Sequence, residues 1–541
     1  SHATRPAAPK RQSAMKTTAA AKPPAARPAR GRKGAPPAVL VAAPSPSVSA
    51  GPDGPPLSVL MIVPEAYPYA STGGLAEVTG GLPLALGRLG HRVTLVLPRY
   101  RGIDVSGAEP LAARVQVGEH AQDVIFHTRT AGNGVTAVFV DIPALFDRDG
   151  LYSDPSGADY PDNAWRFAVF ARAALEYARL RGERPSVIHA HDWQTGAVPV
   201  FQKMHLSPDP VVGGVPAIFT IHNLAFQGLF PSSTIPALGL GWEVLDVQAL
   251  EYWGQISFLK GGINFSERIT TVSPTYAREI LTPELGFGLE GSLARRADAL
   301  TGILNGIDLD EWNPASDDLA GGSFTVDDLS GKAAARRGLL EAAGLPADLP
   351  ASTRPVIGLL TRLTEQKGLD LMAAAAEELM ALDAIAVVLG SGDRKYEAMW
   401  TALAARYPHR VSVTIGFDRR LAHRIIAGSD IFLMPSYFEP CGLNQMYSAR
   451  YGTVPVVRAT GGLDDTVRDA SEPGGNGFKF RDYTPEALVS SLQRALDLYR
   501  NPQEWLRIQR AGMKHDYSWD ASAREYVKVY RDAAGTAPVA G

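Results

Sequence analysis

The apolar pattern near residue 57 predicts a strand, a helix and a second strand. Residues 58–63 form an almost unbroken apolar run and residues 92–97 form another, as is typical of strands buried on both faces. Between them, residues 75–89 carry leucine and valine at helical spacing, after a loop that contains Gly73 and Gly74. Because these elements follow one another within ~40 residues, they predict a βαβ unit and therefore a parallel sheet.

The same pattern restarts in the second half of the chain. Residues 355–360 predict a strand, residues 362–368 a loop, residues 369–382 a helix and residues 384–389 the next strand. Further strands are predicted at 411–415, 431–434 and 454–457, with helices between them at 395–406, 420–428, 443–451 and 463–469. Residues 505–533 are predicted to be helical. The fold class is therefore α/β, with two doubly wound parallel sheets.

The length of 541 residues is too great for one hydrophobic core, so two domains are expected. We predict a tail over residues 1–56, a first domain over 57–308 and a second domain over 309–515. Residues 516–541 are predicted to form a C-terminal helix.

Composition indicates a soluble globular enzyme, with 45% hydrophobic and 20% charged residues. No apolar run approaches the ~20 residues that span a bilayer, and the N-terminus lacks the apolar core of a signal peptide. One cysteine, Cys441, excludes an internal disulfide and suits a reducing compartment. We therefore expect a cytoplasmic protein.

The first 56 residues carry a strong positive charge. They hold nine lysines and arginines against one acid, Asp53, which gives this tail a charge of +8. Because the whole chain has a net charge of −3, residues 57–541 carry a net charge of −11. Rich in Ala and Pro and without aromatic residues, this tail is expected to be disordered. A disordered leader, a basic arm for polyanions and an organelle transit peptide are all open. The acidic body argues against nucleic acid as the main partner.

Candidate chemistry collects where predicted strands of the second domain end. Residues 431–434 stop at Pro435, and the carboxylate of Glu439 follows in a short loop before a helix. Arg362 and Lys367 lie in the loop after residues 355–360. Ligands of α/β proteins gather at such strand ends, and two cations there can neutralise a diphosphate leaving group. Together these residues suggest a sugar-phosphate donor site. Cys441 is interpreted as a small buried residue, because no histidine is close to it in sequence.

Two glycine turns could bring backbone N–H groups close to phosphate. Thr460, Gly461 and Gly462 precede one helix, and Gly73 and Gly74 precede another. A turn of this kind alone is common in α/β proteins. The acids at 464 and 465 fall in the first turn of their helix and suit its dipole.

Polar residues also end strands of the first domain. Residues 187–193 form a strand that ends in a histidine pair with His191, and His222 and Asn223 follow another apolar run. Asp162 precedes a helix and is a candidate N-cap. Phe226 and Phe230 could stack on sugar rings or belong to the core.

These motifs, taken in order, resemble the bacterial glycogen synthase and starch synthase family, retaining glucosyltransferases of the GT-B type. Residues 362–368 match its Arg-Leu-Thr-x-Gln-Lys-Gly motif, residues 189–193 its His-Ala-His-Asp-Trp segment, and residues 221–228 its Thr-His-Asn-Leu-Ala-Tyr-Gln-Gly segment. Residues 71–78 resemble Lys-Thr-Gly-Gly-Leu-Ala-Asp-Val, with Ser71 in place of lysine and Glu77 in place of aspartate. The resemblance covers residues 57–535.

The resemblance implies two Rossmann-like domains that face a central cleft, with the chain end packed back on the first domain. It implies transfer of glucose from ADP-glucose to the 4-hydroxyl at the non-reducing end of an α-1,4-glucan, with retention. No metal or cofactor is expected, and no nucleic acid or membrane partner. The implied catalytic residues are Glu439, His191 and Asp162; the donor-binding residues are Arg362, Lys367, Ser71, Gly73, Gly74, Glu77, Thr460, Gly461 and Gly462; and the acceptor-side residues are His222 and Asn223.

Three alternatives remain open. The first is a retaining GT-B enzyme that uses UDP-glucose or a small acceptor. The second is a weakly active paralogue that binds glucan as a scaffold, suggested by Ser71, Glu77 and Trp253, the last at a position that is Asn in some relatives. The third is a phosphorolytic glucan enzyme, disfavoured by length and by the absence of a lysine context for pyridoxal phosphate.

Overall fold

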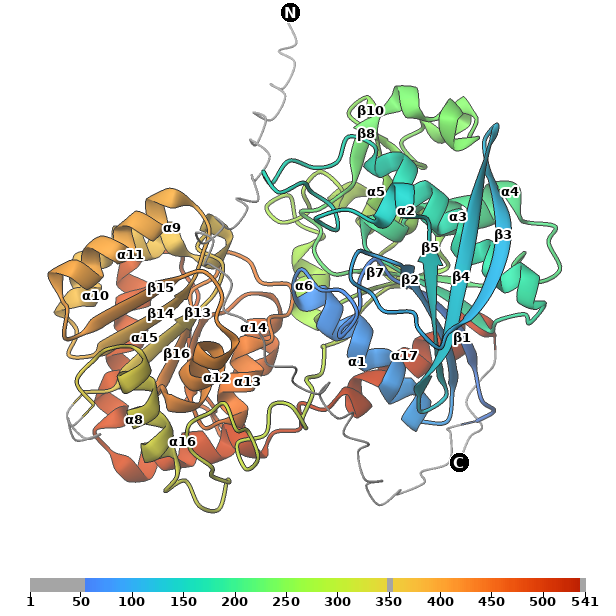
Figure 1. Cartoon of the computed structure of the whole chain (residues 1–541). Coiled ribbons are helices and arrows are strands. Elements are labelled where there is room, and N and C mark those ends of the chain that lie inside the picture. Colours follow the sequence, from blue (N-terminus) through green and yellow to red (C-terminus); the bar gives the residue numbers. More distant parts are fainter. Residues whose placement is uncertain (1–53, 348–353, 536–541) are drawn as a thin grey trace, which may run out of the picture.

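The computed structural model describes residues 54–347 and 354–535, which form two α/β domains side by side (Figure 1). The predicted basic tail lies almost wholly outside the described residues. Within them, no helix is both long and apolar enough to cross a membrane.

The N-terminal domain is built on a nine-stranded sheet with the order β12-β11-β7-β6-β1-β2-β5-β4-β3. Its strands are β1 (Ser58–Ile62), β2 (Arg92–Pro98), β3 (Glu109–Val117), β4 (His120–Gly132), β5 (Val135–Asp141), β6 (Val187–His191), β7 (Ala217–Ile221), β11 (Arg268–Thr271) and β12 (Leu300–Gly302). The strands from β12 to β5 are parallel, as predicted, whereas β4 and β3 pair antiparallel.

The hairpin of β3 and β4 was not predicted. Its signal is an alternation in which Val115, Val117, Val124 and Phe126 are buried between exposed neighbours. Gly118 makes the turn with a φ of 57°, a region that glycine enters without strain.

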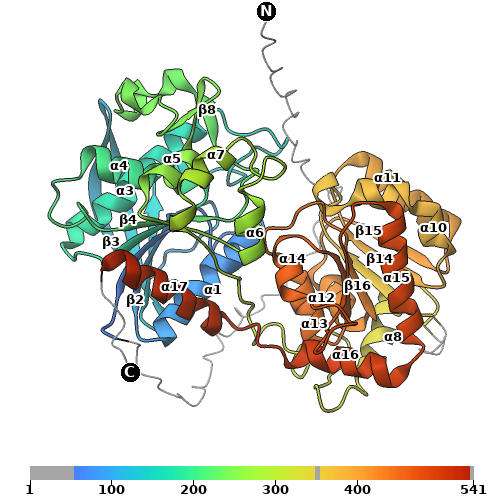
Figure 2. The same cartoon turned by 180° about the vertical axis from the view of Figure 1, so that it is seen from behind.

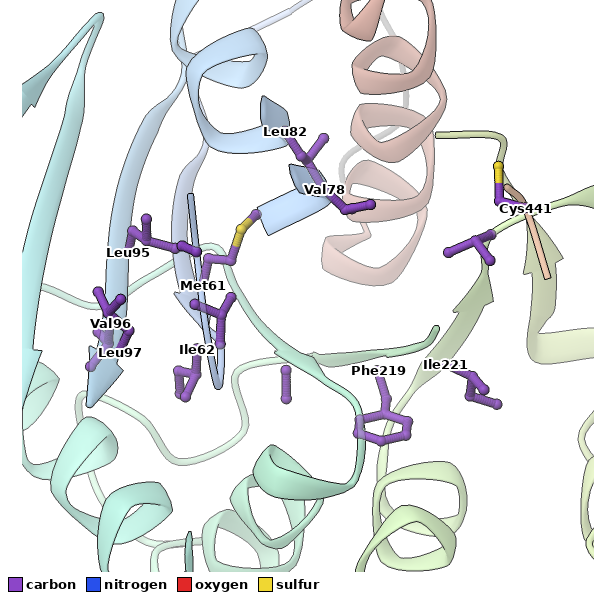
Figure 3. Packing of buried hydrophobic residues seen from close by; sticks show 14 of the residues in the cluster. Met61, Ile62, Val78, Leu82, Leu95, Val96, Leu97, Phe219, Ile221 and Cys441 are labelled. Carbon is purple, nitrogen blue, oxygen red and sulfur yellow. The ribbon is translucent and has the colours of Figure 1, made fainter. Parts of the chain in front are cut away.

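Helices cover both faces of this sheet. They are α1 (Gly74–Arg88), α2 (Pro143–Phe146), α3 (Asn163–Arg181), α4 (Ala197–His205), α5 (Phe258–Phe265), α6 (Pro274–Glu279) and α7 (Glu290–Arg295). Figure 3 shows Val78 and Leu82 of α1 in the same buried cluster as Met61 of β1, which is fully buried. A small sheet of β8 (Leu229–Pro231), β9 (Glu251–Tyr252) and β10 (Gln255–Ser257) lies at the edge of the domain.

The C-terminal domain holds a six-stranded, wholly parallel sheet with the order β15-β14-β13-β16-β17-β18. Its strands are β13 (Val356–Leu360), β14 (Ile385–Gly390), β15 (Val411–Ile415), β16 (Ile431–Met434), β17 (Val454–Arg458) and β18 (Phe478–Phe480). Its helices are α8 (Lys332–Ala342), α9 (Leu369–Ala374), α10 (Ala376–Ala381), α11 (Arg394–Arg406), α12 (Arg419–Gly428), α13 (Asn444–Arg450), α14 (Gly461–Thr466), α15 (Pro485–Tyr499) and α16 (Pro502–Lys514).

Two helix predictions need correction. The helix predicted at 369–382 is interrupted at Ala375 and becomes α9 and α10. The segment predicted as helical at 505–533 is two helices, α16 and α17 (Trp519–Ala534), because the chain crosses between domains at 515–518. There Ser518 pairs in parallel with Ile307 of the other crossing, and the Ile307 N–H donates to the Tyr517 carbonyl over 2.9 Å.

Helix α17 lies along the N-terminal domain beside α1, as both overall views show (Figures 1 and 2). The approach is close, because a Cβ atom on Gly81 of α1 would lie 2.3 Å from Nε1 of Trp519. Near the far end of α17, the hydroxyl of Tyr530 lies 2.8 Å from Nδ1 of His189 in β6. The last helix of the chain therefore completes the N-terminal domain.

We predict that Tyr530→Phe destabilises the N-terminal domain. The substitution leaves the buried Nδ1 of His189 without its partner, and an unsatisfied buried polar group costs about 1–3 kcal/mol. Denaturation followed by circular dichroism measures the loss. Lys528→Gln, on the exposed side of the same helix, is the control, and equal stability of both variants would contradict the prediction.

Candidate active site between the two domains

Both sheets place their predicted site residues at a topological switch point, where the order of strands reverses. In the N-terminal domain this point lies between β1 and β6, and His191 is the last residue of β6. In the C-terminal domain it lies between β13 and β16, with Arg362 shortly after β13 and Glu439 shortly after β16. Open α/β sheets bind ligands at these points.

Glu439 and Lys367 form one ion pair. The Lys367 ammonium donates to both carboxylate oxygens over 2.8 and 2.6 Å, and the Ser436 hydroxyl donates over 3.0 Å. The Glu439 side chain is 7% exposed and that of Lys367 is 17% exposed. Arg362 is exposed, and its guanidinium makes one long bond of 3.3 Å to Gln366. A predicted catalytic acid and two predicted donor-binding cations thus lie at the same edge of the C-terminal sheet.

A pair of buried histidines lies at the switch point of the N-terminal sheet. Nδ1 of His191 lies 2.9 Å from Nε2 of His222. Burial lowers the pKa of His191 well below its usual range and that of His222 to about 3. Among the described residues, Nε2 of the buried His191 has no hydrogen-bond partner. Such an orphaned buried nitrogen is unfavourable unless a ligand or water meets it.

Neighbouring polar groups hold the histidines in place. The ring of His189 lies 4.0 Å from that of His191, and its Nε2 lies 2.6 Å from the Thr220 hydroxyl. Asp192 accepts the backbone N–H of His222 over 2.7 Å, and burial raises its pKa to about 7.

The first glycine turn is oriented by Glu65, a residue that the sequence analysis did not single out. Glu65 accepts the Thr72 hydroxyl over 2.7 Å, the Thr72 N–H over 3.1 Å and the Tyr152 hydroxyl over 3.0 Å. It is 1% exposed, and burial raises its pKa to about 7. In the sequence, Glu65 could have been found as the acid that follows the apolar run of residues 58–63 and Pro64.

The turn itself is open toward the other domain. Ser71, Gly73 and Gly74 are exposed. A Cβ atom on Gly73 would meet nothing within 4 Å, and one on Gly74 would meet only Cδ1 of Leu443, at 3.7 Å. Since Leu443 precedes α13, this turn faces the loop that carries Glu439.

Glu77, predicted to bind the donor, lies near both acids and a cation. Burial, followed by the carboxylates of Glu311 and Asp308, raises its pKa to about 7, while Arg419 acts in the opposite direction. Its donor-binding role stays a prediction.

Asp162 occupies the N-cap position of α3, as predicted, but its side chain does not make the expected cap bond. Its carboxylate instead accepts two bonds from Arg148, of 2.7 and 2.6 Å, which lower its pKa. A bidentate pair with arginine engages both carboxylate oxygens, whereas a cap bond would engage one.

The second glycine turn is occupied by protein oxygens. The Thr460 hydroxyl and the Gly461 N–H donate to Glu279 of the N-terminal domain. The Gly462 N–H donates to the carbonyls of Glu439 and Pro440 over 3.2 and 3.1 Å. The phosphate-binding role of this turn stays a prediction. In this structure the Glu279 carboxylate accepts the hydrogen bonds that a donor phosphate would accept there.

Comparison with known proteins gives the family. Residues 58–295 match the family model of the starch synthase catalytic domain, and residues 346–511 match that of glycosyl transferases group 1. The glycogen synthase of Anaeromyxobacter dehalogenans strain 2CP-C is 48% identical over 480 residues, which cover 88% of this chain and 100% of the relative. That of Koribacter versatilis is 44% identical over 473 residues, covering 87% and 96%. The chain belongs to the glycogen synthase and starch synthase family.

Solved structures agree with this family and its GT-B fold. The catalytic domain of starch synthase IV from Arabidopsis thaliana, bound to ADP and acarbose, matches with a TM-score of 0.81 and 33% identity, over 89% of this chain and 100% of that one. A sucrose-phosphate synthase from Thermosynechococcus elongatus matches with a TM-score of 0.55 and 17% identity, which shows the fold alone. The predicted family, fold class and glucosyltransferase activity are thereby confirmed.

Some residues of the predicted acceptor side are packed inside the N-terminal domain, and others are exposed on its surface. Asn223 accepts the Ala225 N–H over 3.0 Å and shapes the turn after β7. Phe230 packs against Trp193 and Phe258 and belongs to the core. Phe226 is 40% exposed, and Trp253 is 72% exposed at the turn between β9 and β10.

Cys441 is buried, as predicted, and burial raises its pKa to about 12, so the thiol is neutral. Within the described part of the chain, no group of three or more His, Cys, Asp or Glu side chains is placed to hold a metal ion.

We predict a pH-dependent stabilisation by Glu65→Gln. The pKa of Glu65 rises from an ordinary 4.5 to about 7 on folding. Its contribution to stability is therefore complete below pH 4.5 and lost as the pH rises through about 7. A neutral glutamine escapes this loss, which is on the order of 3 kcal/mol.

The melting temperature of Glu65→Gln relative to wild type should therefore increase between pH 5 and pH 8. Glu119→Gln, in the exposed turn of the β3–β4 hairpin, is the control. A difference that stays constant with pH would contradict the assignment.

Proposed function

We propose that this chain transfers glucose from ADP-glucose to the non-reducing end of an α-1,4-glucan with retention of configuration. The observation that carries the proposal is the Glu439–Lys367 ion pair at the switch point of one sheet, with the orphaned Nε2 of His191 at the switch point of the other. Family membership supports it, as do the ADP and acarbose in the Arabidopsis starch synthase structure.

Each residue group has a distinct task in the reaction. The bond between the glucose C1 and the β-phosphate oxygen breaks, and the acceptor 4-hydroxyl oxygen bonds to C1 on the same face. Its proton passes to the leaving phosphate. Arg362 and Lys367 balance the charge that develops on the diphosphate, and the Glu439 carboxylate balances the positive charge on the sugar. Nε2 of His191 bonds a hydroxyl of the donor glucose.

Arg362 and Lys367 supply the positive charge that a metal ion would otherwise bring to the diphosphate. We therefore propose a reaction without a metal ion or cofactor. Donor and acceptor are the partners it requires. Asp162 contributes through its pair with Arg148, beside the start of α3, rather than as a free carboxylate.

Phe417 is proposed as the platform for the nucleotide base. It follows β15, and the adjacent Gly416 N–H bonds to the Gly390 carbonyl at the end of β14 over 3.0 Å. Phe417 is 82% exposed, although phenylalanine is among the residues most often buried. It therefore offers a bare aromatic face on the same edge of the sheet as Arg362, and aromatic faces stack with any base.

We predict that Glu439→Gln abolishes most of the transfer of glucose from ADP-glucose into glycogen. Loss of one preorganised charge in an active site costs on the order of 10²–10³ in kcat. Radiolabelled transfer from ADP-glucose and, separately, UDP-glucose measures it. Glu365→Gln, an exposed acid paired with Lys395, is the matched control.

Near-wild-type transfer by Glu439→Gln would overturn the assignment of this carboxylate. Stronger transfer from UDP-glucose would favour the other donor, consistent with Ser71 in place of the family lysine. Glucan binding without transfer from either donor would favour the scaffold alternative.

We predict that Phe417→Ala raises the KM for the nucleotide sugar and leaves kcat almost unchanged. Stacking of a base on an aromatic ring is worth roughly 1–3 kcal/mol, so KM should rise ~10-fold. Trp242→Ala, at an exposed aromatic of the other domain, is the control. An unchanged KM would show that the base binds elsewhere.

A further inference from the structure

Two short helices from different domains lie side by side and exchange carboxylate contacts. Glu279, the last residue of α6, accepts the Thr460 hydroxyl over 2.9 Å and the Gly461 N–H over 3.1 Å to each oxygen. Asp465 of α14 accepts the Thr275 N–H over 2.8 Å and its hydroxyl over 2.6 Å. Figures 1 and 2 both show α6 against α14. We call these five residues the α6–α14 clasp.

On the side of the C-terminal domain, the clasp continues directly into the loop that carries Glu439. The Gly462 N–H donates to the Glu439 carbonyl over 3.2 Å. A Cβ atom on Gly461 would lie 1.8 Å from that same carbonyl oxygen, and one on Gly462 would lie 2.2 Å from the Cys441 carbonyl oxygen. The turn and the Glu439 loop are therefore in backbone contact, and one cannot shift without the other.

On the side of the N-terminal domain, α6 reaches the histidine pair. Tyr276 of α6 is fully buried, and its hydroxyl accepts the Leu224 N–H over 3.0 Å. Leu224 follows His222 and Asn223 in the chain, and the His222 N–H is fixed by Asp192. One short helix thus contacts both the segment that carries His222 and, through the clasp, the loop that carries Glu439.

The partners of Glu279 in the clasp are a hydroxyl and one backbone N–H. Among the described residues, no lysine or arginine forms an ion pair with it. Burial raises its pKa. Hydrogen bonds of this kind are directional, so they fix the position of the turn more closely than a mobile surface ion pair would.

We propose that Glu279 is a positioning residue for glucosyl transfer, and that the α6–α14 clasp sets Glu439 of one domain in register with His191 and His222 of the other. The inference rests on the proposed function. In this role Glu279 acts through the Thr460 turn and not by contact with the reacting atoms. A competing interpretation is that its carboxylate blocks a seat for the donor diphosphate on the Thr460 turn.

The experiment measures donor kinetics of Glu279→Gln with glycogen as the acceptor. Glutamine keeps one acceptor oxygen but places an amide NH₂ against the Gly461 N–H. We expect kcat to fall by ~10- to 100-fold, since small misplacements far from the chemistry have effects of this size. KM for ADP-glucose should stay nearly constant. The fraction of donor lost to water should rise, because a loosened site admits water.

Three comparisons make the result decisive. Glu284→Gln, an exposed acid just beyond α6, should behave as wild type. Asp465→Asn, in the other domain, should also lower kcat at nearly constant KM. Agreement of the two variants would show that the loss does not come from misfolding of one of them. The double variant should lose less than the product of the two single losses, because both act on one contact.

An unchanged kcat in both single variants would overturn the proposal. A lower KM with a higher kcat/KM in Glu279→Gln would also overturn it, in favour of a blocked phosphate seat. If wild type transferred no glucose, the proposed function would fail. X-ray scattering would then still test whether the α6–α14 clasp holds the two domains together. A larger radius of gyration in the double variant than in wild type supports it, and an identical one refutes it.

Discussion

The close backbone approach at Gly461 and Gly462 is the constraint on which the site depends. Side chains larger than hydrogen would place a Cβ atom about 2 Å from the carbonyl oxygens of the loop after β16. Since the turn after β17 can lie on that loop, its N–H groups bond to Glu439 and to Glu279 of the other domain. The contact between the domains and the position of the Glu439 carboxylate therefore depend on the same turn.

The two domains contribute different kinds of polar groups to the candidate site. The N-terminal domain presents neutral histidines, which burial keeps unprotonated, and such groups suit sugar hydroxyls. The C-terminal domain presents the Lys367–Glu439 pair and the exposed Arg362, which suit a diphosphate and a sugar that becomes positive as the bond breaks. Helix α17 follows the C-terminal domain in the chain but packs on the N-terminal domain. There the Tyr530 hydroxyl lies 2.8 Å from Nδ1 of His189, whose ring lies against that of His191.

Sequence patterns were most informative for parallel strands. The continuous apolar runs of β1, β13 and β16 predicted their bounds to within a residue or two, because a strand buried on both faces has no polar position. The patterns missed the β3–β4 hairpin and joined α16 to α17, because helical spacing alone does not reveal that the chain crosses between domains at 515–518. They placed Asp162 correctly at the start of α3 but did not reveal the partner of its side chain, because Arg148 lies 14 residues away.

By itself, the sequence determined the parallel α/β architecture, the family and most residues of the candidate site, since local spacing and motif identity carry that information. Only the tertiary structure decided their pairing: Lys367 with Glu439, His191 with His222, and Glu279 with the Thr460 turn. It also revealed Glu65 and Phe417, which have no motif of their own. Burial and long-range hydrogen bonds depend on residues distant in the chain, and these contacts exist only after the two sheets have folded and met.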